Sequence, residues 1–341
     1  MLRFVLSIMA VFSCVCAQGV SENAYSAIVV PDRVYSYDRM VDDLEKLKSR
    51  YSLIMTGGHI GTSVEGRKIP AVRLGRGSHK ILVCAALHAR EHITTNYLMY
   101  FLEKYAEAYA SHKVVGDFDV QRLLDNASFY VVPMVNPDGV NIVQCGMEAS
   151  AHCDTLRQMC FRNYEEPVHR SWKANANGVD INRNFDFGWE NCLTDSLPAS
   201  SGFKGFRPLS EPESKALADF AKRIKPEAVV AMHTQGEMLY LSAPDDKAKR
   251  IADRVIRSTK FAPQPIDEPY GSFQDFVDHH FGVFYACVEL CPYIGPRPFD
   301  ESRFYEIWEP AQYVLPIVAD TLIGDDAHGD KKVGKDLRNA L

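Results

Sequence analysis

The sequence contains no run of basic residues and no apolar stretch long enough to cross a bilayer. Its 38 lysines and arginines are outnumbered by 44 aspartates and glutamates, which gives a formal net charge of -6. Because phosphate contacts dominate the affinity of proteins for nucleic acids, we expect no nucleic-acid partner. The longest apolar run, residues 4–17, is too short for a transmembrane helix, so we expect no integral membrane segment.

Internal repeats and long linkers are also absent, and 46% hydrophobic with 24% charged residues is typical of a folded globular protein. Short apolar runs predict buried strands at residues 69–74, 81–87, 128–135, 228–232 and 283–290. Predicted helices follow Ser36, cover 94–109, follow a capping box at 210–213, and cover 304–323 with interruptions at Pro310 and Pro316. Alternating strands and helices predict an α/β fold whose mixed sheet is covered on both faces.

The start of the sequence predicts a secretory signal peptide. The first three residues carry one positive charge, residues 4–16 are apolar, and small side chains precede a cleavage point after Ala17. A lipoprotein anchor at Cys14 or Cys16 is the alternative, although the preceding residues fit a lipid-attachment site poorly. We therefore expect a signal peptide at 1–17, a short segment at 18–34, a charged tail at 324–341, and a secreted protein, extracellular or periplasmic.

Seven cysteines follow Ala17, and none of them belongs to a C-x2-C pair, so a zinc-binding cysteine cluster is disfavoured. Four of the seven lie in a polar stretch at residues 145–192, namely Cys145, Cys153, Cys160 and Cys192. Exported proteins often form disulfides in such stretches, so we expect disulfide bonds here, although the pairing cannot be deduced. Cys84 lies inside an apolar run and is expected to be a buried free thiol.

Metal-binding side chains follow the predicted strands at the points where the strands end. His88 and Glu91 come directly after one strand, His233 ends another, and Glu289 ends a third. Ligands of open α/β sheets bind at the carboxyl ends of the strands, and a carboxylate ending an apolar run is costly without a role. Two histidines and two glutamates placed in this way predict a catalytic zinc site with three protein ligands and a general base.

The same residues also allow a different zinc motif. Residues 88–92 spell H-x-x-E-H, in which His88 and His92 would bind zinc from one helix and Glu91 would be the base. That arrangement requires both histidines on one helix, whereas the predicted helix starts nearer Thr94. It would also leave His233 without a role, so we favour the first arrangement and interpret His92 as an ordinary residue.

Five motifs in order give the sequence its resemblance to a known family. They are residues 61–67 (GTSVEGR), 88–91 (HARE), 136–139 (NPDG), 178–185 (GVDINRNF) and the strand that contains Glu289. Together they resemble the zinc metallocarboxypeptidases over almost the whole of residues 35–323. The resemblance implies one catalytic domain at 35–323, built as a three-layer α/β sandwich with a mixed, mostly parallel sheet, and one Zn²⁺ per chain.

The resemblance also implies roles for individual residues. His88, Glu91 and His233 match the zinc ligands, and Glu289 matches the residue that activates the attacking water and protonates the leaving amine. Other residues match substrate contacts: Asn182 and Arg183 grip the terminal carboxylate of the substrate, and Arg90 makes a secondary contact. A guanidinium is well suited to such a grip because it can donate two parallel hydrogen bonds to a carboxylate.

Three further positions match the pattern of the family less closely. Lys173 stands where the family usually has the arginine that polarises the scissile carbonyl, and it can act as a point charge only. Tyr270 is the nearest counterpart of the tyrosine that caps the bound substrate, but a structural aromatic residue fits the pattern equally well. Gln274 matches the floor of the specificity pocket, where neither a basic nor an apolar substrate side chain is strongly favoured.

Residues 172–175 and 233–237 are most similar to the γ-D-glutamyl-L-diamino-acid peptidases, which trim muropeptides. The 18–34 segment is too short for an activation domain, so we expect the enzyme to be active on secretion. We therefore expect a monomeric enzyme that cleaves the γ-D-Glu–diaminopimelate amide of cell-wall peptides. An ordinary carboxypeptidase of the A/B type is one alternative, and a secreted pseudo-peptidase that acts as a binding module is another.

Overall fold

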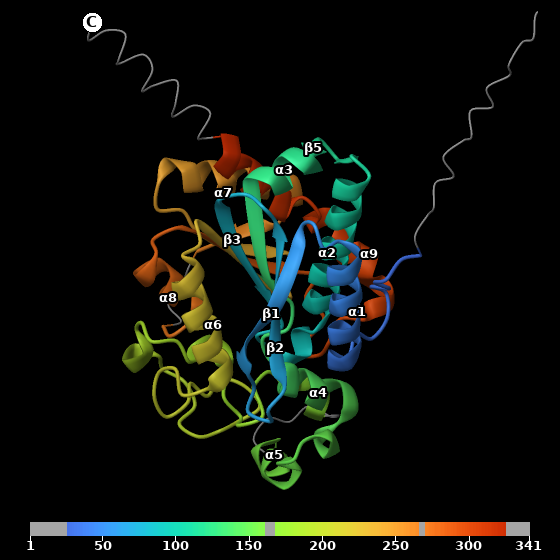
Figure 1. Ribbon diagram of the computed structural model, residues 1–341. Coiled ribbons are helices and arrows are strands. Elements are labelled where there is room, and N and C mark those ends of the chain that lie inside the picture. Colours follow the sequence, from blue (N-terminus) through green and yellow to red (C-terminus); the bar gives the residue numbers. More distant parts are fainter. Residues whose placement is uncertain (1–25, 161–167, 266–269, 325–341) are drawn as a thin grey trace, which may run out of the picture.

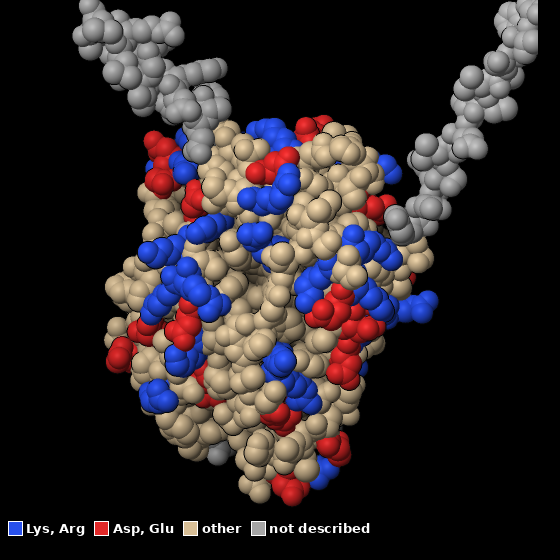
Figure 2. All heavy atoms as spheres, viewed as in Figure 1, with Lys and Arg blue, Asp and Glu red and all other residues tan. Residues whose placement is uncertain are grey.

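The computed structural model describes residues 26–160, 168–265 and 270–324. The predicted signal peptide, the first part of the 18–34 segment and almost all of the predicted tail at 324–341 lie outside the described residues. Among the helices in the described ranges, none is both long enough and apolar enough to span a membrane. On the face shown in Figure 2, Lys and Arg side chains lie among Asp and Glu side chains, so both signs of charge are mixed there.

An eight-stranded sheet runs through the middle of the described structure (Figure 1), in the order β1-β2-β6-β3-β7-β10-β8-β9. Its strands are β1 (Met55–Thr62), β2 (Lys68–Gly75), β3 (His79–Ala85), β6 (Ala127–Val132), β7 (Ala228–Thr234), β8 (Met238–Ser242), β9 (Ala262–Gln264) and β10 (Phe284–Leu290). The three central pairings, β6–β3, β3–β7 and β7–β10, are parallel, as is β8–β9. The remaining three are antiparallel, which confirms the predicted mixed, mostly parallel sheet.

Helices cover both faces of this sheet and complete three layers (Figure 1). One face is covered by α1 (Tyr37–Arg50), α2 (Ile93–Ala110), α3 (Val120–Asn126), α7 (Asp246–Thr259) and α9 (Phe304–Ala311). The other face is covered by α6 (Pro212–Ile224) and α8 (Phe273–His280). Outside these layers lie α4 (Pro137–Cys145), α5 (Cys153–Cys160) and a small hairpin of β4 (Val114–Val115) and β5 (Phe118–Asp119).

Strand periodicity decides which side chains reach the α6/α8 face. Successive side chains of a strand point to opposite faces, and in β7 Val230 and Met232 pack on the α1/α2 side while Val229 packs on the α6/α8 side. His233 therefore points to the α6/α8 side. The parallel register of β7 and β10 places Glu289 directly beside His233. Both residues thus share one face of the sheet at the carboxyl ends of neighbouring strands.

The predicted helix boundaries are correct in two cases. Ser36 caps α1 by accepting a hydrogen bond from the Arg39 backbone N–H at 3.3 Å. The closing helix is interrupted as predicted, because α9 ends at Ala311 and a second helix occupies 314–324. Pro316 then falls in the first turn of that helix, where its missing N–H breaks no intrahelical hydrogen bond.

The predicted capping box at 210–213 is wrong. Glu211 is the N-cap of α6 and makes no side-chain capping bond, while the Ser210 hydroxyl donates to the Glu211 carboxylate. The Glu213 carboxylate accepts instead from the Val64 N–H and from the Asn175 amide, so it is not available to close the box. A capping box does open α8, between Ser272 and Asp275.

The predicted disulfides are also wrong for the cysteines that the structure describes. Cys145, Cys153 and Cys192 are free thiols, and the side chain of Cys160 lies outside the described part of the chain. Cys192 is buried whereas Cys145 is exposed at the end of α4, so these two thiols lie in different surroundings. Cys84 is fully buried and free, as predicted.

A buried carboxylate network joins several motifs behind the predicted site. Asp138 accepts hydrogen bonds from the Ser63 hydroxyl at 2.8 Å and the Glu65 N–H at 2.7 Å, and it pairs with Arg67 at 2.6 Å. The Asn175 amide donates to Glu211 and Glu213 at 2.8 and 3.0 Å. The motifs at 61–67 and 136–139 therefore support the structure around the loop that contains Asn175.

Glu213 should make stability depend on pH. Burial, with the nearby charge of Asp138, raises its pKa to about 7. Since the folded pKa exceeds the unfolded one, this group lowers stability as pH rises from about 4.5 to about 7. The difference in free energy of unfolding between Glu213→Gln and wild type should therefore favour the variant more at pH 8 than at pH 5, by about 2–3 kcal/mol. Urea unfolding at both pH values measures this difference.

The matched control is Glu211→Gln, which removes a neighbouring carboxylate bound to the same Asn175 amide. This control tests whether the loss of any carboxylate in this network changes the pH dependence of stability in the same way. A stability change for Glu213→Gln that is identical at both pH values would contradict the prediction.

Candidate active site

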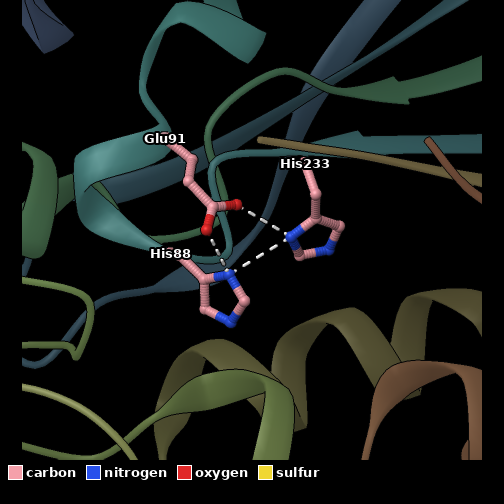
Figure 3. A group of neighbouring side chains, drawn as sticks. All are labelled: His88, Glu91 and His233. Carbon is pink, nitrogen blue, oxygen red and sulfur yellow. Dashed lines mark hydrogen bonds and ion pairs between the residues drawn. The ribbon is translucent and has the colours of Figure 1, made fainter. Parts of the chain in front are cut away.

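The three predicted zinc ligands converge at the carboxyl end of the central strands. His88 follows β3 after two residues, and a short 3-10 turn, η1 (Ala89–Glu91), directs Glu91 back toward it. His233 lies near the end of β7, which neighbours β3 in parallel register. In Figure 3 the ring nitrogens of the two histidines and the carboxylate of Glu91 point toward one another.

The distances among these side chains suit a small cation. Glu91 Oε1 lies 2.9 Å from His88 Nδ1, Glu91 Oε2 lies 2.9 Å from His233 Nδ1, and the two ring nitrogens are 3.2 Å apart. Tetrahedral zinc with bonds of about 2.1 Å has ligand–ligand distances of roughly 3.4 Å. Two imidazole nitrogens and one carboxylate are also the donor types of catalytic zinc sites, so the residues present fit zinc.

The charge state of Glu91 agrees with this assignment. Burial alone would raise its pKa, but the adjacent His88 and His233 imidazoles lower the pKa well below its usual range. Glu91 is only 3% exposed and is therefore a buried carboxylate held by two rings.

Asp180 contacts this group, although no role for it was predicted from the sequence. Its Oδ1 lies 3.2 Å from His88 Nε2, and its Oδ2 lies 3.6 Å from the Lys173 ammonium. Burial favours a raised pKa for Asp180, but Lys173, His88 and Arg183 together lower the pKa well below its usual range. A carboxylate beside the outer nitrogen of a metal-binding histidine favours one orientation of the ring, and here it acts through charge, since the contact lacks hydrogen-bond geometry. The only sequence signal for this role was its place in the motif before Asn182.

Glu289 lies beside the three ligands, where its strand was predicted to bring it. Burial raises the pKa of its carboxyl to about 7, and the charge of Glu91 adds to this effect. Its Oε2 is buried and has no hydrogen-bond partner among the described residues. Cys287 lies two residues before Glu289 on the same face of β10, and its thiol is 3.8 Å from Glu289 Oε1. Sequence reasoning did not assign Cys287 to the site.

A cavity of about 310 Å³, the metal cavity, opens from this group. Its charged or imidazole lining residues are His88, Lys173, Arg183, His233 and Glu289, and the other lining residues are Asn182, Tyr240, Gln264, Pro265, Ser272, Gln274, Tyr285 and Cys287. Gln274 is buried and donates to the Ser242 hydroxyl at 2.9 Å. The predicted pocket residue therefore does line the cavity that contains the metal ligands.

Asn182 and Arg183 lie in the short turn η4 (Ile181–Arg183) on the wall of the metal cavity. The Asn182 side-chain oxygen accepts from the Phe273 N–H at 2.9 Å, which ties η4 to the start of α8. The Arg183 guanidinium donates to the Asn182 carbonyl at 2.7 Å.

The other two predicted substrate contacts line a cavity that adjoins the metal cavity. Arg90 and Tyr270 line an adjoining cavity of about 540 Å³, the Arg90 cavity, which shares Lys173 and Arg183 with the metal cavity. Tyr270 thus lies beside the site but does not line the metal cavity with Gln274.

The alternative H-x-x-E-H arrangement is wrong. His92 is the N-cap of α2 and lies outside the group formed by His88, Glu91 and His233. Its Nδ1 is 3.4 Å from the Glu301 carboxylate, and burial, with the charge of Arg170, lowers its pKa to about 4. The two histidines of the motif therefore do not bind one ion from one helix.

Comparison with known proteins decides the family. A family model described as zinc carboxypeptidase matches residues 40–266. The chain belongs to this family. It is therefore a zinc metallopeptidase, and His88, Glu91 and His233 are the residues in the described structure that could hold its zinc. The family match ends before Glu289, whose place beside the ligands rests on the strand register.

The proteins that are similar to this zinc carboxypeptidase are named for different activities. Gamma-D-glutamyl-L-diamino acid endopeptidase 1 of Lysinibacillus sphaericus is 32% identical over 81% of this chain and 70% of its own length. Mast cell carboxypeptidase A of Mus musculus is 27% identical over 60% of this chain and 46% of its own length. Bovine thrombin-activatable fibrinolysis inhibitor has a similar fold, with a TM-score of 0.69 at 20% identity over 86% of this chain and 99% of that one.

Proposed function

We propose that this zinc carboxypeptidase is secreted and hydrolyses the γ-D-Glu–diaminopimelate amide of cell-wall peptides. The observation that carries the proposal is the lining of the metal cavity. Beside its charged and imidazole groups, this lining consists largely of uncharged polar and aromatic side chains, among them Gln274, Tyr240 and Ser272. The 32% identity to an endopeptidase named for this substrate class supports the same choice.

The reaction requires a polarised carbonyl and an activated water. Zinc, when bound by His88, Glu91 and His233, supplies a Lewis acid and lowers the pKa of water. Burial raises the pKa of Glu289, which suits a group that takes a proton from the attacking water and returns it to the leaving amine. Its Oε2, which has no hydrogen-bond partner among the described residues, supports this role. Lys173, on the wall shared by both cavities, would stabilise the oxyanion that develops.

Arg183 and Asn182 would hold the free carboxylate of the leaving residue. Both line the metal cavity, and the Asn182 backbone is held by Asp180 while its side chain is held by the Phe273 N–H. Asn182 is held by these neighbours, and Arg183, the next residue, lines the same cavity as Glu289. The leaving residue would then bind with its amide nitrogen toward Glu289.

The uncharged polar and aromatic lining of the metal cavity would then select the side chain of the leaving residue. Diaminopimelate ends in an ammonium and a carboxylate, which hydroxyl and amide groups can both bond. An apolar side chain would form no hydrogen bonds with these polar groups, so it would gain less free energy from the same cavity.

Two substitutions separate carboxylate binding from transition-state stabilisation. Arg183→Ala should abolish the preference for a peptide acid over its C-terminal amide, because it deletes the group that binds the carboxylate. Lys173→Ala should lower kcat by about 10²-fold with little change in KM, because an oxyanion contact acts in the transition state. Steady-state kinetics on both substrates measure these effects. A Lys173→Ala enzyme altered only in KM would contradict the oxyanion role.

The substrate is tested by comparing kcat/KM on L-Ala-γ-D-Glu-diaminopimelate with kcat/KM on hippuryl-phenylalanine and hippuryl-arginine. We expect the muropeptide to be hydrolysed at least ~10²-fold more efficiently, since its polar side chain can form hydrogen bonds with the polar lining of the metal cavity. Equal turnover of either hippuryl substrate would make the protein an ordinary carboxypeptidase. Binding of the muropeptide without any hydrolysis would identify a pseudo-peptidase.

Secretion is tested separately by expressing the full chain in a host that exports proteins. We expect the exported protein to begin at Gln18, as determined by N-terminal sequencing. Retention of the uncut chain inside the cell would contradict this part of the proposal.

A further inference from the structure

The Arg90 cavity adjoins the reaction centre on the side of Lys173. It shares Lys173 and Arg183 with the metal cavity, and it is also lined by Arg90, Tyr270 and the loop at 191–195. If the leaving residue occupies the metal cavity and Lys173 lies at the scissile carbonyl, the acyl half of the substrate continues past Lys173. The Arg90 cavity is therefore the space that the acyl half enters.

Arg90 is held firmly at the wall of this cavity. Its backbone N–H donates to the Trp172 carbonyl at 3.0 Å, and the preceding Ala89 N–H donates to the Lys173 carbonyl at 3.1 Å. Its guanidinium donates to the Ser171 carbonyl at 3.3 Å. These bonds join η1 to the loop that contains Lys173, so the backbones that carry the two cationic side chains are held together.

Arg90 is also the cation of this cavity that has no other assignment. Lys173 pairs with Asp180, and Arg183 is assigned to the terminal carboxylate. Arg90 forms no ion pair with any carboxylate in residues 26–160, 168–265 and 270–324, and its contact with Ser171 uses a single N–H. Of the two acids on the cavity wall, Asp180 is buried against His88 and Asp195 is exposed.

We infer that Arg90 binds a second carboxylate of the substrate, the free α-carboxylate of the γ-linked D-glutamate; this inference rests on the proposed function. In a γ-glutamyl amide the scissile carbonyl belongs to the side chain, so the α-carboxylate lies a few bonds further into the acyl half. An ordinary α-linked peptide presents a neutral amide instead. A guanidinium at this position would therefore distinguish γ-linked from α-linked substrates.

The test uses two tripeptides that differ at one group. One is L-Ala-γ-D-Glu-diaminopimelate, and the other carries an α-carboxamide in place of the α-carboxylate of glutamate. Wild-type enzyme should prefer the acid by at least ~10-fold in kcat/KM, the usual effect of a hydrogen bond to a charged group. In Arg90→Gln the preference should disappear, because turnover of the acid falls while that of the carboxamide is unchanged.

The carboxamide serves as an internal control, since a general loss of structure or zinc would lower turnover of both tripeptides together. The matched variant is Arg207→Gln, which removes one positive charge from an exposed arginine outside both cavities. It should keep the wild-type preference and so separates direct binding from the overall charge of the protein.

The outcomes distinguish the two claims. Efficient cleavage of both tripeptides by wild type, or an unchanged acid preference in Arg90→Gln, would overturn the role of Arg90 and leave the proposed function standing. Failure of wild type to cleave either tripeptide faster than the hippuryl substrates would overturn the proposed function, and the inference with it.

Discussion

Replacing Glu289 by glutamine should reduce kcat by at least ~10²-fold while the protein stays folded and keeps its zinc. Glutamine has nearly the same shape but can neither take up a proton from water nor donate one to the leaving amine. Since Glu289 is not one of the three converging ligands, its loss should not release the metal. Turnover under saturating substrate, together with metal analysis, measures both parts of this expectation.

The control for this substitution is Glu237→Gln, the same change at an exposed glutamate just beyond β7 and outside the metal cavity. It should turn over substrate at close to the wild-type rate. If Glu289→Gln contains a full complement of zinc and also turns over normally, Glu289 has no part in the reaction.

Replacing His233 by alanine should abolish stoichiometric zinc binding and, with it, activity. His233 Nδ1 is one of the converging atoms, and its removal leaves one histidine and one carboxylate to hold the ion. The charge of Glu91 would then lack one of the two rings that lower its pKa. Metal content after dialysis against a metal-free buffer measures the loss.

His92→Ala is the informative partner, because His92 is equally buried and lies within the same short stretch of sequence as two of the ligands. It should retain zinc. Zinc loss in His92→Ala with retention in His233→Ala would restore the H-x-x-E-H arrangement.

The convergence of the candidate site residues was predictable because they follow strands. An apolar run that ends on a histidine or a glutamate shows both where the strand stops and which side chain stands at its carboxyl end. His88, His233 and Glu289 were found in this way, and the parallel pairing of β3, β7 and β10 brings the strand ends together. The resemblance of five motifs added the roles, and the family match confirmed the family.

Other features depend on contacts between distant segments and gave no local signal. Asp180 reaches His88 across 92 positions of sequence, and Glu213 accepts from Val64 across 149. That second contact is why the predicted capping box fails, since a local pattern cannot show that its glutamate is bonded elsewhere. The predicted disulfides failed for a related reason, because cysteine spacing does not reveal which thiols the fold brings together.

Titration of zinc-free enzyme with zinc, while the release of free diaminopimelate from L-Ala-γ-D-Glu-diaminopimelate is measured, tests the central claim most directly. The account predicts no release without zinc, a linear rise as zinc is added, and a plateau at one zinc per chain. Release by zinc-free enzyme, or no release at any zinc concentration, would contradict it.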